Sequence, residues 1–231
     1  MTALVVTGTG TEVGKTIVTA AVAALAVADG QKVTVVKPAQ TGVLPGEEAD
    51  VDVLQRLSGG ADAHELVRYD DPLAPATAAK RQNRPAVPVD ALIEEMAQWR
   101  HRDLLLVEGA GGLMVELDAE GHTLADVARG LEAEVLVVTP AGLGALNATA
   151  LTCEALRHRG LGCRGVVIGS WPDHPGLAEQ CNLLDLPRYA QAPLLGAMPA
   201  RAGRLTPAEF FDAARGGLAA ELGGTWHAEV L

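Results

Sequence analysis

The sequence predicts an α/β fold with a doubly wound, mostly parallel sheet and helices on both of its faces. Short apolar runs alternate along the chain with stretches of helical pattern, which is the βαβ rhythm of such folds. The runs are nearly all apolar, as expected for parallel strands that are covered on both sides. A glycine-rich loop joins the first run to the first helical stretch.

Each element of this fold has its own signal in the chain. Strands are expected at residues 4–7, 32–36, 103–107, 134–139 and 165–168, with a weaker candidate at 193–195. Helices are expected at residues 14–28, 49–57, 89–100, 123–129, 143–159 and 207–222. Ligands of a doubly wound sheet bind beyond the C-terminal ends of its strands, so the residues that follow each strand are the candidates for a site.

The 231 residues suit one domain, residues 1–231, because no linker or internal repeat divides them. Residues 39–46 form a predicted loop after the second strand. Residues 70–88 contain four prolines and are predicted to form a long surface loop of the kind that covers a binding site. Residues 223–231 are predicted to form a frayed tail.

Composition excludes several classes of protein. The formal net charge of −11 argues against a nucleic-acid partner, which would need a basic stripe. The longest apolar stretch, residues 17–28, is shorter than the roughly 20 residues of a membrane helix, so no membrane partner is expected. Three scattered cysteines indicate neither a disulfide framework nor a zinc site. We therefore expect a cytoplasmic protein.

The glycine-rich loop Gly8–Thr16 has the layout of a phosphate-binding loop between a strand and a helix. Glycines let backbone N–H groups turn toward a triphosphate, and the helix N-terminus adds positive charge. Lys15 would reach the β- and γ-phosphates, and the Thr16 hydroxyl would bind Mg²⁺. Gly8 lies one residue earlier than the strict pattern requires, so the loop is a stretched variant. The sequence thus predicts a P-loop NTPase-like fold.

Two charged residues are expected at the same edge of the sheet. Glu108 follows the apolar run 104–107 and precedes glycines, where the Mg²⁺ partner of a phosphate loop belongs. The alternative is an acid on a glycine-rich turn. Lys37 follows the second strand and precedes Pro38; it would either stabilise phosphoryl charge or be an ordinary exposed lysine.

Two further segments are ambiguous when considered alone. Asp50 and Asp52 suit the solvated first turn of a helix, and their spacing does not single out either as a metal ligand. Residues 139–147 join a strand to a helix without acids or bases. A glycine-bearing helix N-terminus of this kind can bind a carboxylate, although simple turn chemistry explains it equally well.

Taken together, these motifs resemble the dethiobiotin synthetase family. The matching segments follow the family order: Thr7–Thr16, Lys37-Pro38 with Thr41-Gly42, Val107–Gly112, Leu143-Gly144 with Asn147, and Pro193–Gly196 followed by Met198-Pro199. The resemblance implies a homodimer with active sites at the subunit interface. It also implies that 7,8-diaminononanoate, CO2 and ATP become dethiobiotin, ADP and phosphate, through a carbamate and a phosphorylated carbamate.

The resemblance assigns roles to individual residues. Lys15 and Lys37 would be catalytic, and Thr16, Asp50 and Glu108 would hold Mg²⁺, with Asp52 as the local competitor of Asp50. The diamine or carbamate would contact Thr11, Lys37 and Thr41, with Leu143, Gly144, Leu146 and Asn147 of the other subunit receiving the carboxylate. The nucleotide would contact Glu12, Val13, Gly14, Lys15, Thr16, Ile17, Asp50, Glu108, Gly109, Ala110, Gly111, Gly169, Ser170, Met198, Pro199 and Ala200.

One segment departs from the family pattern. Many members carry Asn-Asp after the strand at 165–168, where the side chains recognise adenine, but this chain has Gly169-Ser170. Backbone groups and one hydroxyl discriminate bases poorly, because no buried polar pair is left unmatched by a wrong base. We therefore expect relaxed base selectivity, with CTP or GTP accepted beside ATP.

Two other functions share part of this sequence pattern. A cobyrinate-type ATP-dependent amidoligase shares the stretched loop, but such enzymes usually carry a glutaminase domain. A nucleotide switch of the partition or septum-site type carries an additional lysine early in the loop, where this chain has Thr9 and Gly10.

Overall fold

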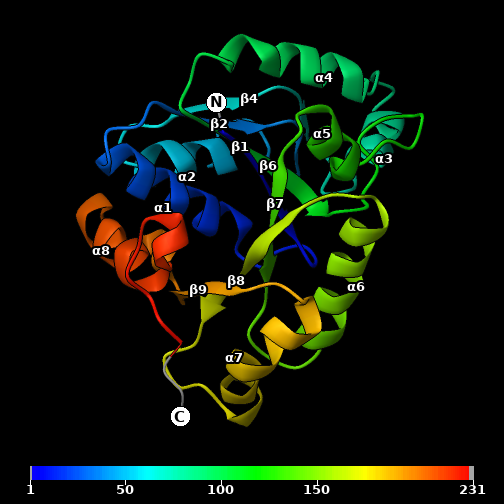
Figure 1. Ribbon diagram of the computed structural model, residues 1–231. Helices are drawn as coiled ribbons and strands as arrows, with labels where there is room; N and C mark the ends of the chain where they lie inside the picture. Colours follow the sequence, from blue (N-terminus) through cyan, green and yellow to red (C-terminus); the bar gives the residue numbers. More distant parts are fainter. Residues whose placement is uncertain (1, 229–231) are drawn as a thin grey trace.

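The computed structural model describes residues 2–228, which form two parallel sheets and eight α-helices (Figure 1). The strands are β1 (Thr2–Gly8), β2 (Val33–Lys37), β3 (Gln40–Thr41), β4 (Asp62–Glu65), β5 (Arg68–Tyr69), β6 (Leu104–Gly112), β7 (Glu134–Thr139), β8 (Cys163–Trp171) and β9 (Leu194–Pro199). The helices are α1 (Lys15–Ala28), α2 (Asp50–Leu57), α3 (Pro75–Arg81), α4 (Val89–Met96), α5 (Leu124–Gly130), α6 (Ala145–His158), α7 (Leu177–Ala190) and α8 (Pro207–Gly217), with single 3₁₀ turns at Ala97–Trp99, Ala202–Arg204 and Ala220–Leu222.

The main sheet has seven strands in the order β4-β2-β6-β1-β7-β8-β9, and its ladders are parallel. Strand β1 is central. The chain first builds the β2–β4 side, returns to place β6 beside β1, and then adds β7, β8 and β9 on the other side. This reversal makes the sheet doubly wound and creates a crevice at the C-terminal end of β1, where a ligand is expected.

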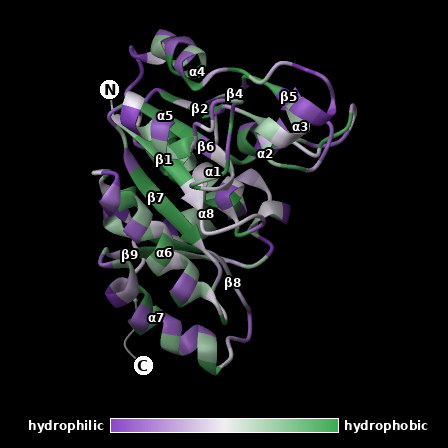
Figure 2. Cartoon of the chain, turned by 90° about the vertical axis from the view of Figure 1, so that its right-hand side faces the viewer, coloured by the Kyte–Doolittle hydropathy of each residue, from purple (hydrophilic) through white to green (hydrophobic). Residues whose placement is uncertain are grey.

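Two hydrophobic cores lie on opposite faces of the sheet because neighbouring residues of a strand point to opposite sides. In β1, Leu4 and Val6 face the core under α1, α2 and α8, whereas Val5 faces the core under α4, α5 and α6. Helix α7 packs beside α6. Figure 2 shows the central strands as hydrophobic and the outer turns of the helices as largely hydrophilic.

All six predicted strands are confirmed, but several are longer than the apolar runs that predicted them. Strand β2 includes Lys37, and β6 continues beyond Val107 to Gly112. The prediction that Glu108 follows the strand is therefore wrong. Pairing with β1 explains the extension, since Val6 pairs with Glu108 and Gly8 with Gly112. The polar and small residues of this segment gave no apolar signal, yet the ladder continues through them.

Five strands and helices have no counterpart in the sequence prediction. Two of them are the two-residue strands β3 and β5, which pair with each other, so the predicted loop 39–46 contains a short strand. Edge strand β4 has the sequence Asp-Ala-His-Glu, too polar to read as a strand. Helix α7 has weak amphipathic character and contains Pro187 in its last turn. The prediction of an irregular loop over 70–88 is wrong in part, because Pro75 begins α3, a position that suits proline. Among the described residues, no helix is both long and apolar enough to cross a bilayer.

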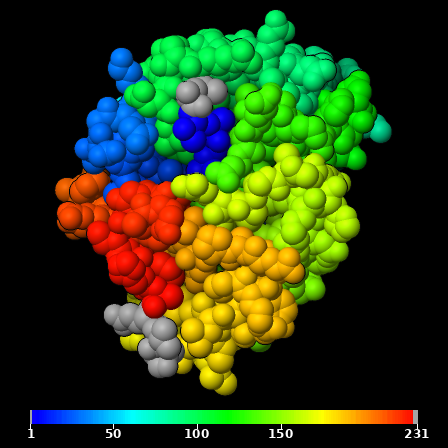
Figure 3. All heavy atoms as spheres, in the orientation of Figure 1, coloured from blue at the N-terminus to red at the C-terminus, as the bar shows by residue number. Residues whose placement is uncertain are grey.

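The prediction of a frayed C-terminal tail is wrong for residues 223–226, and residues 229–231 lie outside the described part of the chain. Thr225 N donates to Arg215 O at 2.7 Å, and Trp226 N donates to Leu218 O at 2.8 Å. The Trp226 side chain packs against the core beneath α8. Figure 3 shows this segment in red, covering the surface near α8. Partial burial of the indole and two backbone hydrogen bonds outweigh the flexibility that Gly223-Gly224 suggested.

Candidate active site

The loop between β1 and α1 has the conformation of a phosphate-binding loop. Thr9 N donates to Val138 O at 2.9 Å, which fastens the loop to β7. Gly14 adopts a left-handed conformation with φ 95° and precedes α1, whose N-terminus has no side-chain cap. The Lys15 ammonium turns back over the loop and donates to Gly10 O at 3.0 Å. Uncapped helix N–H groups and a flanking lysine form a site for an anion.

Strand periodicity brings Lys37 and Glu108 to this loop. In β2, Val33 and Val35 face the core under α1, so Lys37, two residues further, projects from the same face. In β6, Leu104 and Leu106 face that core, and Glu108 follows with the same spacing. Both charged side chains therefore emerge on the α1 face at the C-terminal end of the sheet.

A buried cluster joins the helix to these two strands. Glu108 Oε1 accepts hydrogen bonds from Thr16 Oγ1 and from Lys37 Nζ, each at 2.9 Å. Lys37 also forms an ion pair with Asp50. Glu108 is 0% exposed and Lys37 is 3% exposed, so neither is an ordinary surface charge. The exposed-lysine alternative for Lys37 is wrong, and Glu108 lies within a strand instead of on a turn.

The structure distinguishes Asp50 from Asp52. The Asp50 carboxylate faces Lys37 in the cluster. The Asp52 carboxylate instead accepts a hydrogen bond from Ala49 N at 2.8 Å and so closes the first turn of α2. The helix geometry thus directs Asp50 toward the phosphate loop and leaves Asp52 a structural role.

Burial and neighbouring charges shift the pKa values of Lys15 and Lys37 in opposite directions. Burial lowers the pKa of Lys15, and the positive charge of Lys37 adds to this effect, while Glu108 and Asp50 only partly oppose it. Burial also disfavours the charged form of Lys37, but Glu108 and Asp50 outweigh it and raise the pKa. Lys37 therefore stays protonated near neutral pH. A phosphate bound beside Lys15 would supply a neighbouring negative charge that stabilises the ammonium form of Lys15.

The cluster fits a divalent cation. Glu108 Oε2 is buried and has no hydrogen-bond partner. The Lys37 ammonium, itself a cation, lies between the carboxylates of Asp50 and Glu108. The Thr16 hydroxyl adjoins Glu108. Two carboxylates and a hydroxyl are the oxygen ligands that Mg²⁺ prefers.

The two threonines predicted to contact the diamine lie on different segments, and Thr41 is next to Gln40, whose Oε1 accepts a hydrogen bond from Asp50 N. Thr11 is exposed on the phosphate loop, and Thr41 is half-buried at the end of β3. Next to it, Gly42 has φ 73°, and a Cβ there would lie 2.8 Å from Pro72 Cβ. Pro72 therefore packs directly against the chain just after β3.

The segment predicted to receive the carboxylate lies at the N-terminal end of α6. Leu143 is 93% exposed, and Gly144, with φ 88°, precedes α6 without a side-chain cap. Leu146 is half-buried and Asn147 is exposed. Among the described residues, no hydrogen bond or ion pair joins this segment to Lys37 or Glu108.

The residues predicted for the nucleotide base have different surroundings. Gly169 is buried beneath the phosphate loop, whereas Ser170 is exposed. Met198 packs in the core, so only its backbone is available to a ligand. Ala200 N donates to Trp171 O at 2.7 Å and joins the two segments. Others lie on the phosphate loop, at the start of α1 or at the end of β6: Glu12, Val13, Ile17, Gly109, Ala110 and Gly111. Pro199 is exposed.

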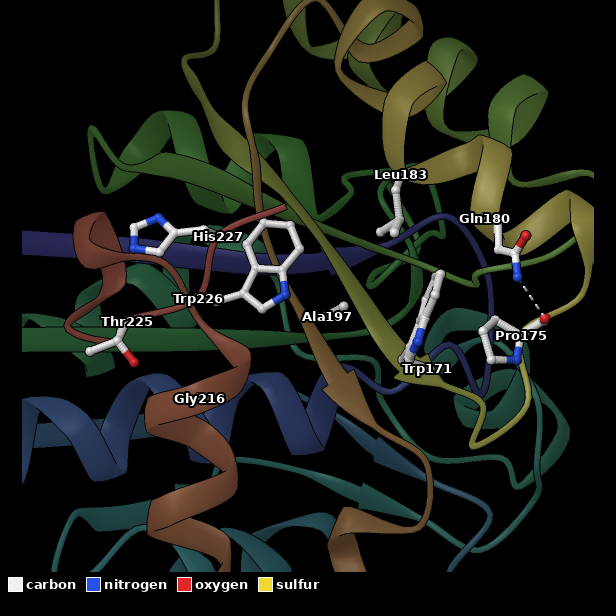
Figure 4. Close-up of a pocket in the computed structure, with 9 residues that line it drawn as sticks. All are labelled: Trp171, Pro175, Gln180, Leu183, Ala197, Gly216, Thr225, Trp226 and His227. Atoms are coloured by element: carbon white, nitrogen blue, oxygen red, sulfur yellow. Dashed lines mark hydrogen bonds between the residues drawn. The ribbon is translucent and has the colours of Figure 1, made fainter. Parts of the chain in front are cut away.

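A cavity of about 520 Å³ that the sequence did not suggest lies beside β9 (Figure 4). The indoles of Trp171 and Trp226 lie on opposite sides of Ala197, which has only a methyl side chain. Leu183 and Gln180 of α7 and His227 complete much of its wall. The cavity shares no lining residue with the Lys37–Glu108 cluster.

Comparisons with known proteins identify the family. A family model described as an AAA domain matches residues 2–206. A protein of Frankia casuarinae named ATP-dependent dethiobiotin synthetase BioD is 61% identical over 99% of this chain and 97% of its own length. The protein of the same name from Streptomyces coelicolor is 57% identical over 100% of this chain and 98% of its own length. The chain belongs to the dethiobiotin synthetase family.

Solved structures support the fold of this synthetase family member but share little of its sequence. Septum site-determining protein MinD of Pyrococcus horikoshii, complexed with Mg-ADP, has a TM-score of 0.57 and 16% identity and matches 96% of this chain and 94% of its own. The cell division ATPase MinD of Pyrococcus furiosus has a TM-score of 0.55 and 20% identity, over 92% of this chain and 90% of its own. The P-loop NTPase-like fold is confirmed. The chain is therefore a ligase of the cyclo-ligase type, and the amidoligase and switch alternatives do not apply.

Proposed function

We propose that the chain is an ATP- and Mg²⁺-dependent dethiobiotin synthetase that converts 7,8-diaminononanoate and CO2 to dethiobiotin, with ADP and phosphate as products. The buried contact of Lys37 and Thr16 with Glu108 behind the phosphate loop carries this proposal. This contact holds a cation and a carboxylate of the kind that Mg²⁺ prefers beside the phosphate loop, where the γ-phosphate would lie. Family membership supplies the substrates.

The phosphate loop and the cluster divide the binding of the nucleotide. Backbone N–H groups of the loop and the Lys15 ammonium would hold the triphosphate. Thr16, Asp50 and Glu108 would hold Mg²⁺, which when bound neutralises phosphate charge. Lys37 would then exchange its carboxylate partners for the phosphoryl group and the carbamate. Because the pKa of Lys37 is raised, it acts as a cation and not as a base.

The reaction needs positioning and charge stabilisation more than a catalytic base. One substrate amine attacks CO2, loses a proton and becomes a carbamate. A carbamate oxygen then attacks the γ-phosphorus of ATP, and the bond to ADP breaks. The second amine attacks the carbamate carbon and loses a proton, the cyclic urea forms, and phosphate leaves with the former carbamate oxygen. Lys37 would stabilise negative charge in the last two steps.

We also propose a homodimer in which α6 of one subunit completes the site of the other. A groove of about 360 Å³ beside the phosphate loop includes Met114 and Leu151, which are 44% and 58% exposed. Exposed apolar residues beside a reactive site indicate a covered surface. Leu143–Asn147 of the partner would receive the substrate carboxylate at the α6 N-terminus. The free thiols Cys153, Cys163 and Cys181 suit a reducing cytoplasm.

The proposed dimer predicts that charged substitutions at two exposed leucines have different effects on subunit association and activity. Leu151→Glu is expected to give monomers and to lower kcat/KM for the diamine by at least about 100-fold, because it buries a charge and removes the partner's contacts. Leu177→Glu, at a 79% exposed position on α7, is the matched control and should change neither property. Light scattering and steady-state kinetics measure both. A Leu151→Glu variant that is dimeric and fully active would contradict the interface.

The direct test of the function is formation of dethiobiotin by purified protein given 7,8-diaminononanoate, bicarbonate, Mg²⁺ and ATP. Its absence under all four nucleoside triphosphates would refute the proposal. The same assay tests the selectivity for the base of the nucleotide. With only the Ser170 hydroxyl and backbone groups available, we expect kcat/KM for CTP or GTP within about tenfold of that for ATP. Strict dependence on ATP would exclude relaxed base selectivity but not the synthetase.

A further inference from the structure

Two glycines from distant parts of the chain are in backbone contact beneath the phosphate loop. Gly14 ends the loop, and Gly169 lies near the end of β8. A Cβ on Gly169 would lie 2.0 Å from Val13 O and 3.0 Å from Gly14 Cα. A Cβ on Gly14 would lie 2.5 Å from Gly169 O. Real side chains do not tolerate such distances, so the Val13–Gly14 peptide rests directly on the backbone of β8.

This contact fixes which way the Val13–Gly14 peptide faces. No cis peptide bond occurs among the described residues, so the carbonyl oxygen of Val13 and the N–H of Gly14 point to opposite sides of a trans peptide plane. The carbonyl is directed at Gly169. The N–H of Gly14 is therefore directed away from β8, into the loop. In a phosphate-binding loop, backbone N–H groups that face inward are the main donors to the anion.

We propose that Gly169 is a positioning residue for the polyphosphate. In this chain the missing side chain leaves the space that the Val13 carbonyl occupies, and with β8 this close to the loop the Gly14 N–H can face a bound phosphate. Family members with Asn at this position must hold the strand and the loop further apart. This inference rests on the proposed function, because it treats the loop as the nucleotide site. It changes the expected role of Gly169 from contact with the base to control of the phosphate subsite. Ser170 is then the neighbour that presents a side chain to the base.

The inference predicts a loss that does not depend on the base. A methyl group at position 169 would push the Val13 carbonyl and turn the Gly14 N–H away from its partner. Displacements of about 1 Å at a binding site cost on the order of 100-fold in function. We expect Gly169→Ala to weaken Mg²⁺-dependent binding of inorganic tripolyphosphate, ATP and CTP by one common factor of at least about tenfold.

Gly162→Ala is the matched control for this experiment. Gly162 precedes the same strand at its other end, and an added Cβ there would meet Glu134 Cγ at 3.4 Å, an ordinary contact. Calorimetric titration of each variant with tripolyphosphate, ATP and CTP measures the affinities, and thermal unfolding without ligand checks the fold. Gly162→Ala should bind all three as the unmodified protein does. Ser170→Ala should change the ratio of ATP to CTP affinity and leave tripolyphosphate unaffected.

A second variant distinguishes an effect on the phosphate loop from strain between the strands of the sheet. A Cβ on Gly169 would also lie 2.7 Å from Val138 Cγ1 of β7, so Gly169→Ala alone strains the packing between strands. Val138→Ala removes that contact. In the Val138→Ala background, Gly169→Ala should still lower tripolyphosphate affinity at least about tenfold relative to Val138→Ala alone.

Two results would overturn the inference. One is tripolyphosphate affinity within about twofold of the parent in the double variant. The other is a loss confined to one nucleotide, which would make Gly169 a contact of the base. Both measurements are of binding alone. Failure to form dethiobiotin would therefore refute the proposed function without deciding the role of Gly169. A binding result that overturns the role of Gly169 would not contradict the synthetase activity.

Discussion

Replacing Lys37 with alanine is expected to lower kcat by at least about 1000-fold while Mg²⁺-nucleotide binding remains within a few-fold of its normal affinity. Lys37 is the buried cation between Asp50 and Glu108, and its raised pKa keeps it charged. The negative charge it would stabilise is greatest during phosphoryl transfer and ring closure. Removing it therefore affects the transition state much more than the bound nucleotide.

The same substitution leaves two carboxylates without their shared ammonium. Loss of one member of a buried ion pair costs about 3–5 kcal/mol in stability, so thermal unfolding of Lys37→Ala must be measured with and without Mg²⁺. Because Mg²⁺ would restore positive charge, we expect it to stabilise the variant more than the unmodified protein. Lys32→Ala is the matched control, since Lys32 is exposed and lies at the other end of β2. Unchanged kcat in Lys37→Ala would remove Lys37 from the reaction.

Much of the main sheet could be predicted because its strands are nearly continuous apolar runs with a helix between them. The same periodicity would have placed Lys37 and Glu108 on one face, since each lies two residues beyond core residues of its strand, Val35 and Leu106. The phosphate loop could be found because its chemistry requires glycines, lysine and threonine in sequence. These features depend on local pattern, which the sequence contains directly.

Other features depend on contacts between distant segments and could not be predicted. The spacing of Asp50 and Asp52 does not show which of them would bind a metal. Only the folded position of the start of α2 turns Asp50 toward Lys37 and Asp52 toward Ala49 N. Gly169 gave no structural signal, because its importance is the absence of a side chain beneath a loop more than 150 residues away in the chain. Strand β4 forms through pairing with β2 despite its polar residues.

Glu108→Gln is the second substitution with a large expected effect. Glutamine keeps the size of the side chain and an oxygen that can accept from Thr16 Oγ1, but it removes the negative charge. Glu108 Oε2 is the buried oxygen without a protein partner, so the charge lost is the one that suits a divalent cation. We expect kcat to fall at least about 100-fold and the Mg²⁺ concentration for half-maximal activity to rise at least about tenfold.

The metal dependence distinguishes this role from a structural one. If Glu108 served only to neutralise Lys37, its replacement would destabilise the fold and lower activity equally at all Mg²⁺ concentrations. If it binds the metal, high Mg²⁺ should recover part of the lost activity, and the apparent nucleotide affinity should follow the Mg²⁺ concentration. Glu134→Gln, at an exposed position that begins β7, is the matched control and should change neither quantity. A Glu108→Gln variant with unaltered Mg²⁺ dependence would place the metal elsewhere and leave Asp50 and Thr16 without their common partner.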